Sequence, residues 1–345
     1  MWDVTWSVPI SLAVFLLSAV VIGVVGTRLT GLGDRLADQT GLGEAFVGAV
    51  FLGAATSLPG ITASVTAALD GYASLALSNA VGGIAAQTVF LALADLTYRE
   101  ANLEHAAASV PNMLQASLLV ILLAVMLLGM VGPNVSWLGL HPVTPLLLAV
   151  YLGGIRMVQR AHNWPMWRPR VTHQTRVDTP DEPTVAEHRS LAPMWVSFIG
   201  SAVLVIVAGW AVTQAIESIA DQTALNHTIA GGVFIAVVTS LPELVTSVAA
   251  VRRGALTLAI GGVVGGNAFD TLFAAVSDVA YRSGSIYHAA TTRELAIIVL
   301  TVLMTSVLLM GLLRRERSGI ARMGFESFFI LVIYLAGLAM IGLME

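Results

Sequence analysis

The second half of the chain repeats the first half at a constant offset of 183 residues (220 − 37, 239 − 56, 281 − 98). The offset is constant, so residues 18–99 match residues 201–282 without a gap, and the matches include polar residues that chance similarity of apolar segments does not explain. The clearest pairs are Ser18-Ala19-Val20 with Ser201-Ala202-Val203, Ala37-Asp38-Gln39-Thr40 with Ala220-Asp221-Gln222-Thr223, Thr56-Ser57-Leu58-Pro59 with Thr239-Ser240-Leu241-Pro242, and Tyr98-Arg99 with Tyr281-Arg282. This pattern predicts a duplicated fold.

Ten segments have the length and character of membrane-spanning helices, which need about 20 consecutive apolar residues. Hydrophobic residues make up 57% of the chain and charged residues only 11%, against roughly 25% charged residues in soluble domains. The segments lie near 8–26, 43–69, 73–97, 113–131, 140–158, 194–216, 227–251, 255–280, 294–313 and 324–343. We therefore predict an all-α polytopic membrane protein with about ten transmembrane helices. The absence of cysteine excludes disulfides and thiolate metal sites.

An odd number of spans in each half gives the two halves opposite orientations in the membrane. We expect two inverted five-helix repeats, residues 1–158 and 194–345, joined by a mobile linker at 159–193. All 17 basic residues are arginines, and with both termini outside only Arg282 and Arg293 face outward. We therefore expect an integral protein of the prokaryotic plasma (inner) membrane with an external N-terminus, an external C-terminus and a cytoplasmic linker. Tryptophans and arginines at the start of the linker, from Trp164 to Arg170, suit contact with lipid headgroups.

Two carboxylates lie deep in apolar spans, where a charge costs several kcal/mol. Glu243 follows Thr239-Ser240-Leu241-Pro242, and Asp270 ends the segment Gly265-Gly266-Asn267-Ala268-Phe269-Asp270. Pro242 and its repeat partner Pro59 lack a backbone N–H and free carbonyl groups of the preceding turn. Carbonyl, hydroxyl and carboxylate oxygens are the ligands of hard cations such as Na⁺ and Ca²⁺. These residues predict a cation site where two interrupted helices meet.

Other polar and small residues in the spans have simpler explanations. A serine or threonine in a membrane helix commonly bonds the carbonyl one turn before it, so we expect Thr62, Ser64, Thr246 and Ser247 to be structural. Asp95 and Asp278 lie near helix ends, where a carboxylate costs little. Most of the paired glycines are expected to allow close helix packing, namely Gly82, Gly83, Gly261, Gly262, Gly265 and Gly266.

The Thr-Ser-Leu-Pro-Glu segment at 239–243, the glycine-rich segment ending at Asp270 and the repetition of this frame in two halves resemble the calcium/cation antiporter superfamily. This superfamily includes the sodium/calcium exchangers and the calcium/proton exchangers. The resemblance implies secondary active antiport, with alternating access to a cation site near the membrane midplane. The expected partners are inorganic cations and membrane lipid, with no nucleic acid, and no cofactor is expected besides the transported Ca²⁺, Na⁺ or H⁺.

The resemblance also implies a set of ligands. Glu243, Asp270, Thr239 and Thr56 are the expected metal ligands, and the candidate cation-binding residues also include Ser240, Ser57, Gln87, Asn79 and Asn267. The first repeat departs from the pattern, because Gly60 stands where a glutamate is usual and Gln87 stands opposite Asp270. Gly83 and Gly266 stand where serine is usual. One negative charge is therefore missing, and water can fill the space that Gly60 leaves.

Three functions are compatible with this departure. The first is an antiporter whose specificity is shifted toward monovalent cations or proton coupling, since a partly dry glutamate such as Glu243 can exchange a proton for an ion. The second is a Ca²⁺ exchanger with an asymmetric site, and the third is a transport-inactive sensor or assembly protein that keeps the fold. We do not expect an enzyme, because the chain contains neither His-Glu-x-x-His nor Gly-x-Ser-x-Gly.

Overall fold

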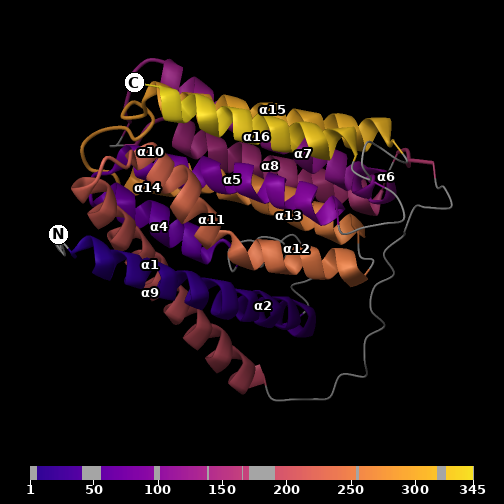
Figure 1. Cartoon of the computed structure of the whole chain (residues 1–345). Helices are drawn as coiled ribbons and strands as arrows, with labels where there is room; N and C mark the ends of the chain where they lie inside the picture. Colours follow the sequence, from indigo (N-terminus) through magenta and orange to yellow (C-terminus); the bar gives the residue numbers. More distant parts are fainter. Residues whose placement is uncertain are drawn as a thin grey trace.

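The computed structural model describes residues 6–40, 56–96, 102–137, 140–164, 166–170, 191–253, 256–316 and 324–344. Apart from one isolated bridge between Trp137 and Leu140, every regular element in these ranges is helical (Figure 1). This confirms the predicted all-α class. The part of the expected second span at residues 43–55 lies outside the described residues.

The helices of the two halves follow one another along the chain. In the first half they are α1 (Val8–Val21), the π-helical turn η1 (Ile22–Gly26), α2 (Thr27–Thr40), α4 (Leu58–Leu69), α5 (Ala73–Asp95), α6 (Leu103–Ala106), α7 (Val110–Val131) and α8 (Val143–Asn163). In the second half they are α9 (Leu191–Gln222), α10 (His227–Ile229), the π-helical turn η2 (Ala230–Ile235), α11 (Ala236–Thr239), α12 (Leu241–Arg253), α13 (Leu256–Asp270), α14 (Leu272–Ala280), α15 (Thr292–Arg314) and α16 (Phe325–Leu343).

Seven helices in the described ranges are long and apolar enough to cross a membrane, and an eighth span results if the bent pair on either side of Ser240 counts as one. Helix α4 is apolar but only 12 residues long. Each of the ten expected segments contains a helix in the part of it that the structure describes. The protein is therefore an integral membrane protein.

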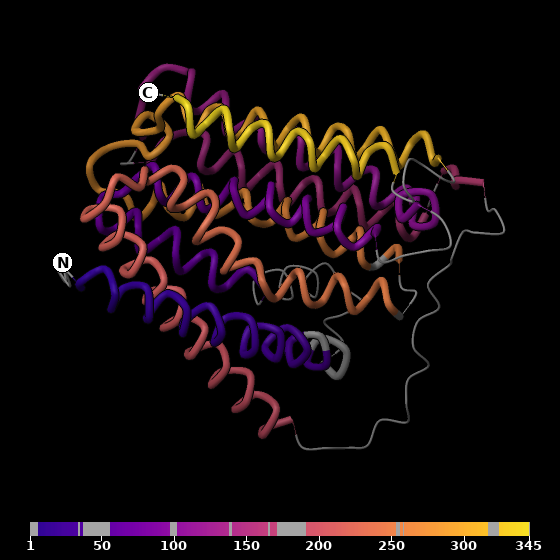
Figure 2. Tube along the Cα trace, in the orientation of Figure 1, coloured from indigo at the N-terminus to yellow at the C-terminus, as the bar shows by residue number. Residues whose placement is uncertain are grey.

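Helix α5 lies at the centre of the bundle (Figure 2), and 94% of its most apolar part is buried. Its small residues allow this position, because they let neighbouring helices approach closely. A Cβ atom on Gly82 would lie 2.3 Å from the carbonyl oxygen of Gly232 in η2, so the two backbones are in contact. The helical stretch Val8–Gly33, which begins with α1, and helix α9 lie at the edge of the bundle. Only 17% of the most apolar part of each is buried.

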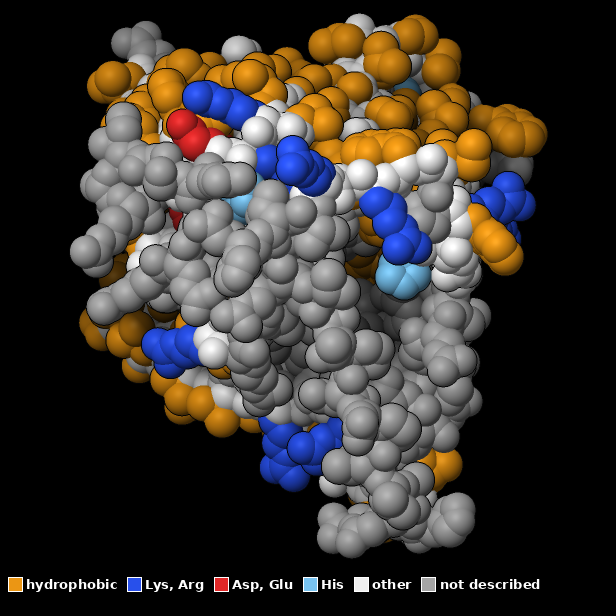
Figure 3. Space-filling model, turned by 90° about the vertical axis from the view of Figure 1, so that its right-hand side faces the viewer, with side chains coloured by type: hydrophobic (Ala, Val, Ile, Leu, Met, Phe, Trp, Pro, Cys, Tyr) orange, Lys and Arg blue, Asp and Glu red, His pale blue; other side chains and the backbone are white. Residues whose placement is uncertain are grey.

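The two termini lie at one end of the bundle, and arginines gather at the other. Figure 1 shows the N-terminus and the C-terminus at the left-hand end, and Figure 3 shows several basic side chains on the right-hand face. Arg293, one of the two exceptions to the predicted distribution, donates to the carbonyl oxygen of Met344 at the end that carries the termini.

Contacts between glycine and proline occur twice, at positions related by the repeat. A Cβ on Gly26 would lie 2.6 Å from the ring of Pro242, and a Cβ on Gly209 would lie 3.0 Å from the carbonyl oxygen of Pro59. Gly209 is the repeat partner of Gly26, and Pro242 is that of Pro59. The proline at each helix break therefore packs against a glycine of the opposite half.

Asp95 and Asp278 also make equivalent contacts. Asp95 accepts hydrogen bonds from the backbone N–H groups of Leu103 at 2.7 Å and Gly324 at 3.0 Å. Asp278 accepts them from the repeat-related residues, Ile286 at 3.1 Å and His141 at 3.0 Å. Both carboxylates are buried and serve the fold, in agreement with the expectation from their places near helix ends. These contacts show that the offset of 183 also relates residues outside 18–99 and 201–282, where the sequence itself shows no clear matches.

Helices continue into both ends of the expected linker. Helix α8 continues to Asn163 and α9 begins at Leu191, so both ends of the predicted segment 159–193 are helical. Trp164, Met166 and Trp167 are exposed, and contact of this segment with lipid headgroups stays a prediction. Residues 171–190 lie outside the described ranges.

Candidate cation site

A bend of 48° separates the segment His227–Thr239 from α12. Pro242 is the second residue of α12 and has no N–H to continue the helical hydrogen bonds, and Ser240 takes φ −95° and ψ 7° at the break. Ser57, its repeat partner, precedes α4 with φ −85° and ψ 2°. The two serines therefore sit at equivalent breaks in the two halves.

A small cavity lies between the two breaks. Its volume is about 10 Å³, enough for about one water molecule or one cation. The lining residues come from both halves and are Ser57, Gly60, Asn79, Gly83, Gln87, Thr239, Ser240, Glu243, Asp270 and Phe273. Seven of the nine candidate residues predicted from the sequence are thus brought together.

Asp270 is held by donors from the first half. The hydroxyl of Ser57 donates to its Oδ1 at 2.6 Å, and the amide of Gln87 donates to its Oδ2 at 2.8 Å. The same amide also donates to Ser240 Oγ at 3.2 Å. Each oxygen of this buried carboxylate therefore has a donor, and hydrogen bonds of this kind stabilise the ionised form.

Glu243 has a different environment. Its side chain is 9% exposed, and within the described part of the chain its Oε2 atom is buried with no hydrogen-bond partner. An unpaired buried carboxylate oxygen is costly unless it binds a proton or a cation. Of the two carboxylates that line the cavity, Glu243 is therefore the one that still needs a proton or a cation.

Asn79 connects the two helix breaks. Its amide nitrogen donates to the carbonyl oxygen of Gly60 at 3.1 Å and to Ser64 Oγ at 2.7 Å. Its Oδ1 lies 3.4 Å from the hydroxyl of Thr239, which also donates to the Ala236 carbonyl oxygen at 3.3 Å. Asn79 and Thr239 both line the cavity, so both residues remain candidate ligands.

Thr56 and Asn267 are not among the lining residues. The amide of Asn267 donates to the Ile84 carbonyl oxygen at 3.4 Å and to Thr88 Oγ1 at 3.2 Å, which makes it a contact between α13 and α5. Its Oδ1 atom is buried with no partner among the described residues, so a ligand role for Asn267 stays a prediction. Thr56 stays a candidate by its place in the motif alone.

The space beside Gly60 is filled by a residue that the sequence did not indicate. A Cβ on Gly60 would lie 2.5 Å from Cε2 of Phe273, so the aromatic ring occupies the place where a side chain at position 60 would begin. The ring takes part of the space that Gly60 leaves, while the cavity that Gly60 also lines has room for about one water molecule, so a water molecule beside Gly60 stays a prediction. Only the three-dimensional fold brings α14 to α4, and no sequence pattern marks this contact.

Most of the residues expected to be structural are structural. Thr62 donates to the Leu58 carbonyl oxygen at 2.9 Å, and Thr246 donates to that of Pro242 at 3.0 Å, one turn before it in each case. Ser64 differs, because it donates to the Ala76 carbonyl oxygen of α5 at 3.2 Å and so joins two helices. Gly83 and Gly266 have no atom closer than 3.6 Å to an added Cβ, so close packing does not require glycine there.

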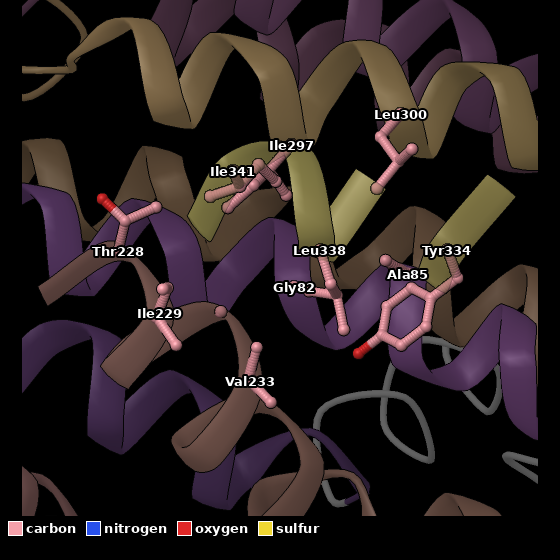
Figure 4. A pocket seen from close by; sticks show the side chains of 11 residues that line it. Gly82, Ala85, Thr228, Ile229, Val233, Ile297, Leu300, Tyr334, Leu338 and Ile341 are labelled. Carbon is pink, nitrogen blue, oxygen red and sulfur yellow. The ribbon is translucent and has the colours of Figure 1, made fainter. Parts of the chain in front are cut away.

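A second small cavity lies on the other side of α5, between η2, α15 and α16 (Figure 4). Among its labelled side chains only Thr228 and Tyr334 carry oxygen, and the rest are apolar, including Ile297, Leu300 and Ile341. It offers no carboxylate and does not suit a cation.

The family of the chain follows from comparison with known proteins. Residues 10–153 and 193–342 match the family model described as "Sodium/calcium exchanger protein". The chain belongs to the sodium/calcium exchanger family. The two matched segments leave out the region of the linker, and they include every residue of the cavity.

Two curated proteins are similar to this member of the family. The putative antiporter CaxA of Alkalimonas amylolytica is 27% identical over 284 residues, which cover 81% of this chain and 82% of that protein. The inner membrane protein YrbG of Escherichia coli (strain K12) is 27% identical over 116 residues, which cover 33% of this chain and only 36% of YrbG.

Solved exchangers share the fold. The H⁺/Ca²⁺ exchanger CAX matches with a TM-score of 0.63 at 13% identity, covering 96% of this chain and 88% of CAX. The sodium-calcium exchanger NCX_Mj matches with a TM-score of 0.61 at 18% identity, covering 96% of this chain and 99% of NCX_Mj. Together with the family match, these structures place the chain in the calcium/cation antiporter superfamily.

Proposed function

We propose that the protein is a secondary active cation antiporter of the sodium/calcium exchanger type, in which the cavity at Glu243 and Asp270 opens alternately to the two sides of the membrane. The observation that carries this proposal is the make-up of the cavity. The second half supplies both carboxylates, and the first half supplies Ser57 and Gln87, the two donors to Asp270. A movement of one half against the other would therefore change the site directly.

The proposed architecture has ten spans in two inverted repeats, residues 1–158 and 194–345, with the linker 159–193 in the cytoplasm and both termini outside. The paired contacts of Asp95 and Asp278 support the repeats. The arginine-rich face in Figure 3 lies opposite the end that carries the termini, as the positive-inside rule requires of a cytoplasmic face.

Glu243 is the proposed coupling residue. Asp270 already has two hydrogen-bond donors, whereas the Oε2 atom of Glu243 has none among the described residues. A proton on Glu243 would remove the buried charge, and a cation bound between the two carboxylates would replace that proton. Competition of this kind exchanges a proton for a cation.

Proton coupling is the version of antiport that the cavity favours. The cavity has room for about one ion, and Phe273 covers the space at Gly60 where a further ligand would stand. Separate sites for Na⁺ and for Ca²⁺, each with its own shell of oxygens, are therefore not favoured in this cavity. A proton on Glu243 requires no such shell. We therefore propose exchange of H⁺ for Ca²⁺ or Na⁺.

Flux measurements in proteoliposomes test this proposal. The purified full-length protein is compared with Glu243→Gln, Asp270→Asn and the control Asp221→Asn, whose carboxylate is 48% exposed and lies outside the cavity. Imposed gradients of Ca²⁺ or Na⁺ should drive proton movement in the opposite direction in the parent and in Asp221→Asn. Glu243→Gln should abolish coupled proton movement.

Two outcomes would contradict the proposal. If Glu243→Gln transports as well as the parent, the site assignment fails. If the parent moves neither Ca²⁺, Na⁺, K⁺ nor H⁺, the alternative of a transport-inactive sensor or assembly protein with the exchanger fold is favoured.

A further inference from the structure

Three buried carboxylates lie together at the arginine-rich end of the bundle, away from the cation cavity. Asp95 ends α5, Glu104 lies in α6, and Glu326 lies in the first turn of α16. Their side chains are 0%, 1% and 0% exposed, respectively. The role proposed for the cation cavity uses none of these groups.

The three carboxylates meet around Gly324. A Cβ at this glycine would lie 3.1 Å from Glu326 Oε1 and 3.2 Å from Glu104 Oε2, and the N–H of Gly324 donates to Asp95 Oδ2 at 3.0 Å. Glu104 Oε1 accepts a hydrogen bond from Ser327 at 3.2 Å. Glu104 Oε2 and both oxygens of Glu326 are buried, with no partner in the described part of the chain. Three oxygens without a partner, from two fully buried carboxylate groups, thus lie close to one point.

The repeat-related site at the opposite end of the bundle has the same local structure without these acids. Residue by residue, at the offset of 183, Asp278 corresponds to Asp95, Tyr287 to Glu104, and Val143 to Glu326. The hydroxyls of Thr144 and Tyr287 lie 3.3 Å apart, at the positions where Ser327 donates to Glu104. A neutral tyrosine and a valine therefore complete this local fold, and the fold itself does not require Glu104 or Glu326.

The charged and titratable side chains near the cluster, among the described residues, have partners of their own. Arg314 pairs with Glu316 at 3.3 Å, and the guanidinium of Arg315 donates to the carbonyl oxygens of Arg170 and His105 at 2.7 and 3.3 Å. Nδ1 of His105 lies 2.6 Å from the carbonyl oxygen of Arg315.

Neighbouring helices add no further charge at the cluster. Helix α7 carries no charged residue, and the only one in α13, Asp270, lies at the cation cavity. Arg99, Glu100, Arg317 and Arg322 lie outside the described ranges. Burial and the nearby charges of Asp95 and Glu326 raise the pKa of Glu104 well above its ordinary value.

We propose that Glu104 and Glu326 share a proton, and that with Asp95 they form a proton-binding site that holds α6 and α16 against the end of α5. A shared proton gives a carboxyl group and a carboxylate that hydrogen-bond to each other, which satisfies oxygens that otherwise have no partner. A metal ion is less suitable, because no group of three or more His, Asp or Glu side chains among the described residues has the geometry to hold one.

This site makes stability depend on pH with a definite sign. The folded protein holds the proton above the ordinary glutamate pKa of about 4.3, whereas the unfolded chain has released it. Stability therefore falls as the pH rises from that value through the higher pKa of the folded state, because the folded state binds more protons in this range. At alkaline pH two buried charges repel each other and loosen α6 and α16.

Thermal unfolding of the purified full-length protein in detergent, measured as a function of pH, tests this proposal without relying on transport. The variants are Glu104→Gln and Glu326→Gln. Glu316→Gln is the control because it removes a nearby carboxylate that pairs with Arg314 and is not part of the cluster. The parent and Glu316→Gln should both lose melting temperature as the pH rises above the ordinary glutamate range, and the loss of the Glu316 charge should displace this dependence without flattening it. Glu104→Gln and Glu326→Gln should flatten this dependence.

A direct readout of the proton accompanies the unfolding experiment. The infrared carbonyl stretch of a protonated carboxyl group should be present in the parent just above the ordinary glutamate range of pH and should be missing a component in Glu104→Gln. If single variants do not fold, Glu104→Tyr combined with Glu326→Val reproduces the composition of the repeat-related site and should restore folding without the pH dependence.

Three results would overturn the proposal. One is an infrared band that neither glutamine variant changes, and another is a flattened pH dependence in Arg317→Gln or Arg322→Gln, which would mean that an arginine neutralises the acids. The third is a rise in melting temperature on adding Ca²⁺ or Mg²⁺ at alkaline pH that Glu104→Gln abolishes, since the ligand would then be a divalent cation. Absence of transport activity in the parent, with the expected pH dependence of its melting temperature, would contradict the proposed antiport and leave this proposal standing.

Discussion

Gln87 donates its amide to Asp270 at 2.8 Å, and the two residues are repeat partners, 183 positions apart. They therefore face each other where the two halves meet. One copy of the position carries a negative charge, and the other carries the donor that stabilises this charge. Two ionised carboxylates could not make this contact, because they would repel each other at this distance.

We expect Gln87→Met to lower the free energy of unfolding by about 1.5–3 kcal/mol, the value of a hydrogen bond to a charged group. In an Asp270→Asn background the same substitution should cost less, because the charge is gone. A double-mutant cycle measured by denaturant unfolding gives the coupling between the two residues. Effects that add within about 0.5 kcal/mol would show that they do not interact.

Restoring the usual glutamate at position 60 requires a second change. Gly60→Glu alone should destabilise the protein by about 1–3 kcal/mol, because it forces the ring of Phe273 to move. Gly60→Glu with Phe273→Ala should fold and add a carboxylate to the cavity. We expect this double variant to bind Ca²⁺ at least tenfold more tightly than Phe273→Ala alone, as measured by calorimetry.

An unchanged Ca²⁺ affinity in the double variant would argue against a shift of specificity through the loss of this glutamate. The result would then favour an exchanger whose preference is set by other residues. Phe273→Ala serves as the control because it opens the same space without adding charge.

Gly82 and Gly262 provide a matched pair of glycines in two central helices. Gly82→Ala should cost about 1–3 kcal/mol, because its Cβ would lie 2.3 Å from the backbone of Gly232. Gly262→Ala has no atom within 4 Å of its Cβ, so it should be neutral or stabilise the helix by about 0.5–1 kcal/mol. Melting temperatures of the two variants check this, and equal losses would contradict the close contact of α5 with η2.

Asp278 should be essential to the fold at the end that carries the termini. It accepts hydrogen bonds from His141, Ile286 and the hydroxyl of Thr144. Asp278→Asn weakens all three, each worth about 1.5–3 kcal/mol for a charged acceptor. The exposed carboxylate of Asp221 is the control, since Asp221→Asn should change stability by no more than about 0.5 kcal/mol. Comparable yields and melting temperatures for the two variants would refute this role.

Much of the fold is readable from local sequence. The breaks at Ser57 and Ser240 follow from Pro59 and Pro242, because a missing N–H acts on the adjacent turn whatever the surroundings. The grouping of Glu243 with Asp270 follows from the repeated frame. These features depend on residues close to each other in the chain or on a comparison of its two halves.

Contacts between distant helices were not readable in this way. The ring of Phe273 at Gly60 depends on how α14 packs against α4, and the amide of Asn267 turns to α5 because a carbonyl group is within reach there. Glu104 and Glu326 were also missed. A signal existed, since both stand where the other half carries neutral residues, but the sequence matches end before these positions.

The equivalent aspartate contacts at Asp95 and Asp278 bear on the energetics of the proposed cycle. Two identical inverted halves would interchange their conformations on reorientation, so that the inward-open and outward-open states would have equal free energy. Here the backbone contacts of the two aspartates match, but the repeat partners of Glu104 and Glu326 are the neutral residues Tyr287 and Val143. Any preference of the empty protein for one side must come from such unmatched positions. A site whose ionisable groups lie at one end of the bundle only would make that preference depend on the pH of one compartment.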